Sequence, residues 1–183
     1  LDIRMQEGGR HELFGTHNKL LALDNGLYLE CIAVDPKAIK PKHPRWFNLD
    51  NFFGKPRLSN WVCSSEDLKI DLDKMQVLLG QVIEVSRGDY SWSITVPENG
   101  ILPFDGCFPA LIKWPSIQKH PLIKLPPSGL SLDSLTIYHP DASKLQELLR
   151  SLSDERVCFR VRSYSGFSAH FSNSLGQETV LET

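Results

Sequence analysis

The chain has 183 residues, with 20 Lys and Arg against 22 Asp and Glu and a formal net charge of -2. This balance gives no basic field for nucleic acid, and 41% hydrophobic with 23% charged residues is typical of a folded globular protein. Its apolar runs are only a few residues long, far below the roughly 20 that span a bilayer. We therefore expect a cytoplasmic protein with no nucleic-acid partner and no membrane span.

The four cysteines lie far apart, with no CxxC pair and no zinc-ligand spacing. This excludes a disulfide scaffold and a zinc finger. Cys31, Cys63 and Cys158 occur in apolar, strand-like runs. We expect them to be reduced thiols buried as small hydrophobic side chains, in keeping with a cytoplasmic protein.

The first segment, residues 1–35, is predicted to be all strand. A short strand starts at Asp2 and ends at a Gly8-Gly9 turn, since two glycines tolerate positive φ angles. An Asn-Gly pair then predicts a hairpin of residues 19–23 with residues 27–34. Side chains alternate between the two faces of a strand, so Glu30 falls on the same face as Tyr28 and Ile32.

Residues 36–57 form a long proline-rich loop that carries the aromatic pair Trp46-Phe47. A connection of this length usually forms the lid or wall of a site. Residues 58–114 then predict the order β-α-β-β-β. In the helix, apolar residues recur from Leu68 to Leu79, Ser64 or Ser65 is the expected cap, and a glycine ends it.

A proline-rich linker, residues 115–130, leads to a third segment, residues 131–183, which repeats the order β-α-β-β-β with Asp141 as the expected helix cap. Residues 1–35 correspond to the rear part of the same unit without its opening strand and helix. We therefore predict an α+β fold of repeated βαβββ modules, with curved mixed sheets around a cleft. Because the chain begins with Leu1 rather than Met, we expect the missing strand and helix to precede it.

Five motifs carry a resemblance to a known family. They are GGRHxxxGTHNxLLALxxGLYLExIAVDP (8–36), PRWFxLD (44–50), SRGDxSWxITVP (86–97), LPFDGxFPxLIxW (102–114) and HPxxxLPxSGLxLxSLTIYHPD (120–141). Together these motifs resemble the glyoxalase-like domains of the vicinal-oxygen-chelate superfamily, which includes glyoxalases, bleomycin resistance proteins and dioxygenases. The resemblance implies βαβββ modules whose sheets surround a central cavity.

In that superfamily the resemblance implies a divalent metal (Mn, Fe, Ni, Zn or Mg) held by a His or Gln and a Glu from each of two modules. Glu30 matches one of these glutamates. The first-strand histidine would precede this chain, and Trp61 and Ser134 stand where the other modules would supply one. The closing strand of the second module offers Lys113 rather than a carboxylate. One ligand of four is therefore identifiable.

Several further residues are candidates for the site. Glu30 is the candidate metal ligand or general base, and His17 is its candidate catalytic neighbour and hydrogen-bond partner. Arg10 would orient an anionic group of the substrate. The remaining candidates for substrate binding are His11, Asn18, Trp46 and Phe47, although the two aromatic residues suit core packing as well.

Arg87 and Asp89 are interpreted as an ion pair that fixes a hairpin. Their motif is thus assigned to structure rather than to the site.

Two functions stay open. One is a metal-dependent lyase, isomerase or dioxygenase that acts on a substrate with adjacent oxygens, in which Glu30 is a ligand or base. The other is a non-catalytic binder that sequesters a hydrophobic small molecule in an aromatic pocket, without metal or other cofactor. In both, the partner is a small-molecule ligand. An incomplete first module would expose a sheet edge, so a homodimer is also expected.

Overall fold

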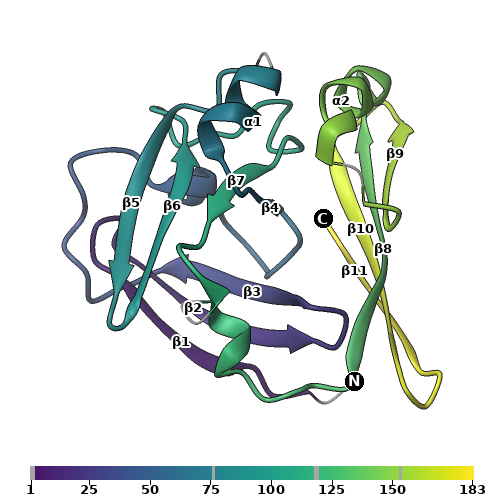
Figure 1. The fold of residues 1–183 in the computed structure, drawn as a ribbon, viewed down its shortest axis with the longest axis horizontal. Coiled ribbons are helices and arrows are strands. Elements are labelled where there is room, and N and C mark those ends of the chain that lie inside the picture. Colours follow the sequence, from purple (N-terminus) through teal and green to yellow (C-terminus); the bar gives the residue numbers. More distant parts are fainter. Residues whose placement is uncertain (1–2, 76, 118–119, 153) are drawn as a thin grey trace.

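The computed structural model describes residues 3–75, 77–117, 120–152 and 154–183. The fold is α+β, as predicted, with three separate sheets and a few short helices. The first two sheets lie side by side, and the third stands against them as a separate layer with α1 and α2 at one end (Figure 1).

The elements follow one another in three groups along the chain. The first sheet contains β1 (Gln6–His11), β2 (Thr16–Leu23) and β3 (Leu27–Val34), and the second contains β4 (Val62–Ser64), β5 (Gln81–Arg87), β6 (Tyr90–Val96) and β7 (Ala110–Lys113). The third contains β8 (Leu130–His139), β9 (Val157–Val161), β10 (Gly166–Asn173) and β11 (Glu178–Glu182). The helical segments are η1 (Trp46–Asn51), α1 (Leu68–Met75), η3 (Pro121–Ile123), α2 (Ala142–Leu148) and η4 (Arg150–Leu152).

The first sheet is an antiparallel meander in the order β1-β2-β3, and the predicted hairpin is confirmed as β2 and β3. Its loop has three residues and closes with Gly26 at a φ of 81°, a conformation that favours glycine. The predicted turn at Gly8-Gly9 is wrong. Both glycines lie inside β1, where the register with β2 shifts between Glu7 and Gly9 as in a β-bulge.

The second sheet has the order β4-β7-β6-β5, in which β4 and β7 are parallel and the other pairs antiparallel. Helix α1 connects β4 to β5. Its cap is Asp67, whose Oδ1 accepts the backbone N–H groups of Lys69 and Ile70 at 3.0 and 3.1 Å. The serine cap predicted from the sequence is therefore wrong, since the hydroxyl of Ser65 donates instead to Asp71.

The third sheet repeats the element order of the second but pairs its strands differently. Its order is β11-β10-β8-β9, so the opening strand β8 is central and runs parallel to β9. In the second sheet the opening strand β4 lies at the edge. Asp141 precedes α2 as expected, yet its side chain makes no capping hydrogen bond. The repeat thus extends to the order of the elements and not to their pairing.

Three hydrophobic clusters join the three sheets pairwise. Between the first and second sheets lie Phe14, Trp46, Trp92, Ile94 and Ile112. Between the second and third lie Met75, Phe108, Leu111, Ile137 and Phe167. Between the first and third lie Leu21, Leu23, Leu130, Ala169 and Phe171. Neighbouring residues of β7 such as Leu111 and Ile112 belong to different clusters, so both faces of the second sheet are covered.

The cysteines only partly follow the prediction. All four are free thiols, and Cys107 is buried while Cys63 and Cys158 are partly buried. Cys31 is exposed, because β3 turns it to the face opposite Glu30. The prediction that Cys31 is buried is therefore wrong.

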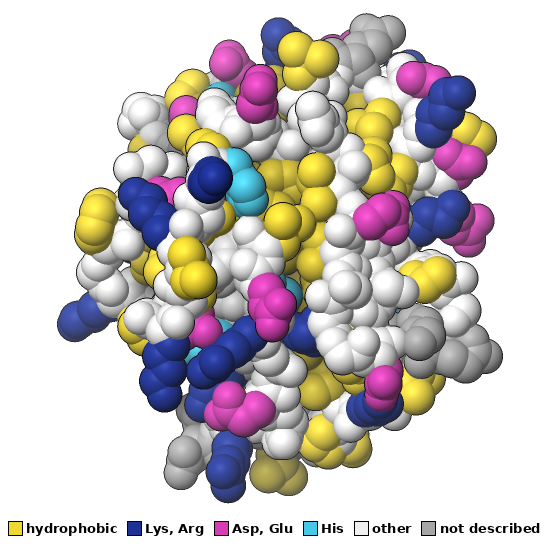
Figure 2. All heavy atoms as spheres, turned by 90° about the vertical axis from the view of Figure 1, so that its left-hand side faces the viewer, with side chains coloured by type: hydrophobic (Ala, Val, Ile, Leu, Met, Phe, Trp, Pro, Cys, Tyr) yellow, Lys and Arg dark blue, Asp and Glu magenta, His cyan; other side chains and the backbone are white. Residues whose placement is uncertain are grey.

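The molecular surface carries both signs of charge. On the face shown in Figure 2, basic side chains gather at the lower left with acidic ones among them, and hydrophobic side chains are visible along a central furrow. None of the described helices is both long and apolar enough to cross a membrane.

Candidate functional site

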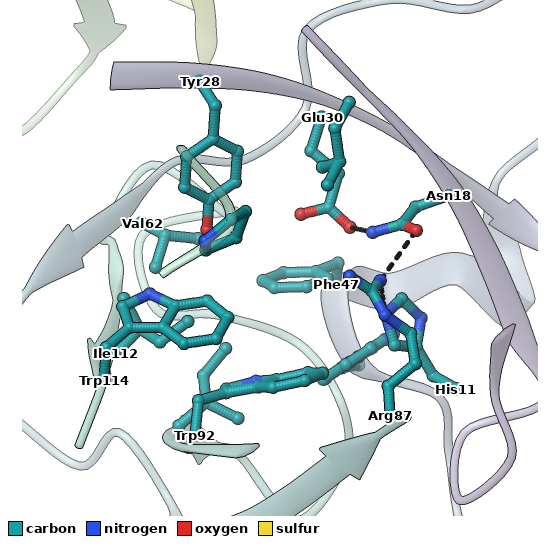
Figure 3. Close-up of a pocket in the computed structure, with 14 residues that line it drawn as sticks. His11, Asn18, Tyr28, Glu30, Phe47, Val62, Arg87, Trp92, Ile112 and Trp114 are labelled. Carbon is teal, nitrogen blue, oxygen red and sulfur yellow. Dashed lines mark hydrogen bonds between the residues drawn. The ribbon is translucent and has the colours of Figure 1, made fainter. Parts of the chain in front are cut away.

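A pocket lies between the first and second sheets (Figure 3). Its cavity volume is about 40 Å³, and it is partly open to solvent. The pocket is thus a narrow slot. Four polar side chains line it: His11, Asn18, Glu30 and Arg87. Its other walls are aromatic and aliphatic.

Glu30 and Asn18 reach the pocket from neighbouring strands of the first sheet. In the β2–β3 register Glu30 pairs with Leu20 and Asn18 with Ile32, so these residues share one face of the sheet. Glu30 lies on the face predicted from the sequence. Asn18 Nδ2 donates a hydrogen bond of 2.7 Å to Glu30 Oε1. The amide of Asn18 therefore supports the carboxylate directly.

Arg87 enters the same pocket from the end of β5 in the second sheet. Its Nη1 donates to Asn18 Oδ1 at 2.9 Å and contacts His11 Nε2 at 3.1 Å. A hydrogen-bonded chain thus runs from Arg87 through the Asn18 amide to Glu30 (Figure 3). Gly8 makes room for it, because a Cβ atom at this position would collide with the Asn18 side chain.

His11 is a neutral member of this polar group. An arginine can only donate, so His11 Nε2 accepts from Arg87 and the ring proton lies on Nδ1, which faces Thr16 Oγ1 at 3.1 Å. Burial and, after it, the positive charge of Arg87 lower the pKa of His11 to about 3. The imidazole is therefore uncharged at neutral pH.

The environment of Glu30 raises the pKa of its carboxyl group above the ordinary value. Surrounding protein atoms desolvate the carboxyl group and raise its pKa, and this effect outweighs the hydrogen bond from Asn18 and the charge of Arg87, which both lower it. The residue nevertheless keeps exposed surface. Glu30 is therefore a carboxylate that water or a ligand can reach and that takes up a proton more readily than an ordinary glutamate.

Aromatic rings form most of the remaining wall, namely Tyr28, Trp46, Phe47, Trp92 and Trp114. Trp92 and Trp114 lie 5.2 Å apart between ring centroids. Burial raises the pKa of Tyr28, so its phenol stays protonated. The aliphatic side chains that complete the wall are Leu20, Val62, Ile94, Ile112 and Pro121.

The long loop supplies two of these rings and holds them firmly. Trp46 stacks on Phe14 with ring centroids 4.1 Å apart and an interplanar angle of 11°. The loop is tied by Arg45, whose guanidinium pairs with Asp50 and whose backbone N–H donates to the same carboxylate. Phe47 adopts a φ of 56°, an uncommon value for a bulky residue. The backbone thus turns sharply where Phe47 meets the pocket.

Five of the residues proposed from the sequence lie together in the pocket, namely Glu30, His11, Asn18, Trp46 and Phe47. His17 and Arg10 do not. They pair with each other across β1 and β2 on the opposite face of the sheet, where Arg10 forms an ion pair of 3.1 Å with Asp35.

The interpretation of His17 as the hydrogen-bond partner of Glu30 is therefore wrong, because Asn18 holds that place. Likewise, Arg10 lies outside the pocket and cannot orient a group bound in it.

Arg87 is the polar residue that sequence reasoning missed. Its guanidinium bonds to Asn18 and His11 in the site, so its interpretation as part of a purely structural ion pair does not hold. The signal lay in the strand alternation. Ile83 and Val85 pack against the core, and Arg87 continues their face. Alternation would also have identified Trp92, which faces the same cluster from β6.

The donor set of the pocket does not fit a divalent metal. Glu30 is its single carboxylate, both ring nitrogens of His11 have partners, and Arg87 places a positive charge beside them. Within residues 3–75, 77–117, 120–152 and 154–183, no group of three or more His, Cys, Asp or Glu side chains is arranged to hold a metal. Trp61, which stands where the second module would supply a metal ligand, donates its indole N–H to the carbonyl of Cys107 at 2.7 Å instead.

Comparison with known proteins gives two findings. A family model described as a glyoxalase-like domain matches residues 1–153. Among solved structures, the chain is similar to that of a hypothetical protein from Staphylococcus aureus, with a TM-score of 0.62 and 15% sequence identity over 96% of this chain and 84% of that one. At this identity the similarity concerns the fold alone. No curated protein matches the chain significantly.

Proposed function

The chain belongs to the family of glyoxalase-like domains, and from this premise we propose that the pocket between the first and second sheets binds a small organic molecule without a divalent metal at Glu30. The single observation that supports this proposal is the combination of aromatic walls with one convergent polar group, Glu30-Asn18-Arg87. Ligand sites are typically apolar clefts in which a few placed polar groups fix the orientation of the ligand.

The aromatic lining favours the binder over the metal-dependent enzyme. Five aromatic rings offer a large apolar contact area, and burial of apolar surface is the main source of affinity for small ligands. A metal would need further oxygen or imidazole donors near Glu30, whereas Glu30 is hydrogen-bonded to an amide and, through it, linked to a guanidinium.

A second candidate function is proton transfer between Glu30 and the bound molecule. The raised pKa of this carboxyl group brings it closer to the range in which a general base or acid works near neutral pH. Arg87 would then stabilise negative charge on the ligand. In this role Glu30 would act on the molecule that the pocket binds, so both candidates share one site.

Binding is tested by a thermal-shift screen of small dicarbonyls, catechols and neutral bicyclic compounds, because a ligand that binds the folded state raises its melting temperature. Hits are repeated on Trp114→Ala, which removes a pocket wall, and on Trp61→Ala, a matched change outside the pocket. We expect Trp114→Ala to abolish the shift and Trp61→Ala to retain it. Equal shifts in both variants would refute the pocket as the binding site.

The metal-free part of the proposal has its own test. Mn²⁺, Fe²⁺, Ni²⁺ and Zn²⁺ are titrated into the wild type and into Glu30→Gln by calorimetry. We expect the same weak binding in both proteins, because the pocket lacks a second carboxylate and carries Arg87. Tight binding that depends on Glu30 would favour the metalloenzyme instead.

A further inference from the structure

We infer that the ligand of this pocket is a neutral, flat molecule with a hydrogen-bond donor and an acceptor on neighbouring atoms, as at the edge of a cyclic amide. The inference rests on the proposed binding function and deepens it by naming the class of ligand. It follows from the atoms that the polar group leaves free, from the charges on them and from the shape of the walls.

Glu30 and Arg87 each use only part of their hydrogen-bonding capacity within the described structure. Glu30 accepts through Oε1 and Arg87 donates through Nη1. Among the described residues no hydrogen bond involves Glu30 Oε2 or Arg87 Nε and Nη2. In Figure 3 the second carboxylate oxygen of Glu30 points toward the space between Tyr28 and Phe47, and the guanidinium of Arg87 lies on the same side of the pocket. An acceptor and a donor therefore face one ligand position.

The charges at this position oppose a ligand of either sign. Glu30 and Arg87 bring one negative and one positive charge, and Asn18 joins them. A cation would suit the aromatic rings, yet it would meet the guanidinium, which already lies 5.7 Å from the centre of the Trp92 ring. An anion would meet the carboxylate of Glu30. A neutral group that donates to Glu30 and accepts from Arg87 satisfies both.

The walls limit the shape of the molecule. The cavity volume of about 40 Å³ is far below the range of roughly 300–1,000 Å³ found for pockets that enclose a whole ligand, so the slot admits one flat edge of a molecule whose remainder lies in the opening toward solvent. Trp92 and Trp114 form one side, with ring planes inclined by only 37°, and Phe47 lies across from Tyr28 in the same view (Figure 3). A flat body of one or two rings makes the most contact with such surfaces.

The test uses four bicyclic probes of similar size: isoindolinone, which carries an adjacent N–H and C=O, N-methylisoindolinone, protonated isoindoline and indane carboxylate. Dissociation constants are measured by NMR titration, followed through the indole N–H signals of Trp46, Trp92 and Trp114, which line the pocket. We expect isoindolinone to bind about tenfold or more tightly than its N-methyl form, since methylation removes a hydrogen bond to a charged group. Both charged probes should bind more weakly still.

Two variants locate the effect. In Glu30→Gln the oxygen that faces the ligand becomes an N–H₂ donor while the Asn18 bond is kept, so the preference for isoindolinone over its N-methyl form should fall below about twofold. Glu84→Gln, an exposed position on β5, is the matched control and should leave it unchanged. Equal affinity of the two neutral probes, or tighter binding of a charged one, overturns the inference while the binding function stands. If no probe moves the pocket tryptophan signals, both fail.

Discussion

Asn18 bridges the two charged residues of the pocket, so its removal should destabilise the fold as well as the site. Asn18→Ala deletes the 2.7 Å bond to Glu30 and the 2.9 Å bond from Arg87. A hydrogen bond to a charged group contributes roughly 1.5–3 kcal/mol. Glu30 keeps exposed surface and can regain water, so we take about 1 kcal/mol for each bond, or about 2 kcal/mol in total. For a chain of this size that lowers the melting temperature by about 4–8 °C.

Urea unfolding of the wild type and Asn18→Ala measures this loss. The matched control is Asn51→Ala, which removes an exposed bond of the same length to Asn48 and should cost less than about 0.5 kcal/mol. The pKa of Glu30 should rise further in Asn18→Ala, because the hydrogen bond that lowers it is lost. If the two variants lose equal stability, or if the pKa of Glu30 falls, the bridging role of Asn18 is refuted.

Three further predictions concern pH, thiol reactivity and the core. The pKa of His11 is about 3 in the folded protein and about 6.5 in the unfolded chain. Its contribution to the free energy of unfolding is therefore fully present above pH 6.5 and falls by about 2 kcal/mol at pH 5, where the unfolded chain binds more protons. The loss should appear in urea unfolding of a Glu30→Gln background, because the raised pKa of Glu30 has the opposite effect on stability and is removed there. His11→Asn should abolish the loss, and a stability that does not change with pH would contradict the prediction. Cys31 should be the first thiol to react with a disulfide reagent in the native protein, since it is exposed while burial raises the pKa of Cys107 to about 11. If Cys31→Ser keeps the same fast phase of thiol reaction, this prediction is wrong. Phe108→Ala should cost about 3–5 kcal/mol in urea unfolding because this fully buried ring would leave a cavity; a loss below about 1 kcal/mol would show that the core collapses around it.

The strands and the hairpin were predictable because short-range patterns encode them. Alternation and the Asn-Gly pair located β2 and β3, and the same alternation placed Glu30 on the pocket face. The helix caps were less predictable. Several residues with suitable side chains precede each helix, and tertiary contacts decide between them, as when Asp67 rather than Ser65 caps α1.

The register of the β2–β3 hairpin decides which of His17 and Asn18 lies on the pocket face. The three-residue loop that ends at Gly26 pairs Leu20 with Glu30 and thereby brings Asn18 to the pocket face. A two-residue turn would pair Leu21 with Glu30 and bring His17 there instead. One residue of loop length thus exchanges the two faces of the strand.

The contribution of Arg87 and the strand order of the third sheet depend on contacts far apart in sequence. Local patterns predict that a segment is a strand, but not which strand it will pair with. β8 therefore lies inside its sheet while β4 lies at an edge, although both open a β-α-β-β-β segment. Similarly, alternation places Arg87 on the core face of β5, but nothing near it in sequence indicates that this face meets the first sheet.

The bonds from Arg87 to Asn18 and His11 span 69 and 76 residues. The pocket therefore cannot exist during synthesis until the chain has emerged well past β5 and the second sheet has docked on the first. Contacts of such long range form late and slowly. A molecule that binds here would stabilise the docked arrangement of the two sheets, so a small-molecule ligand would increase the amount of correctly folded protein in cells.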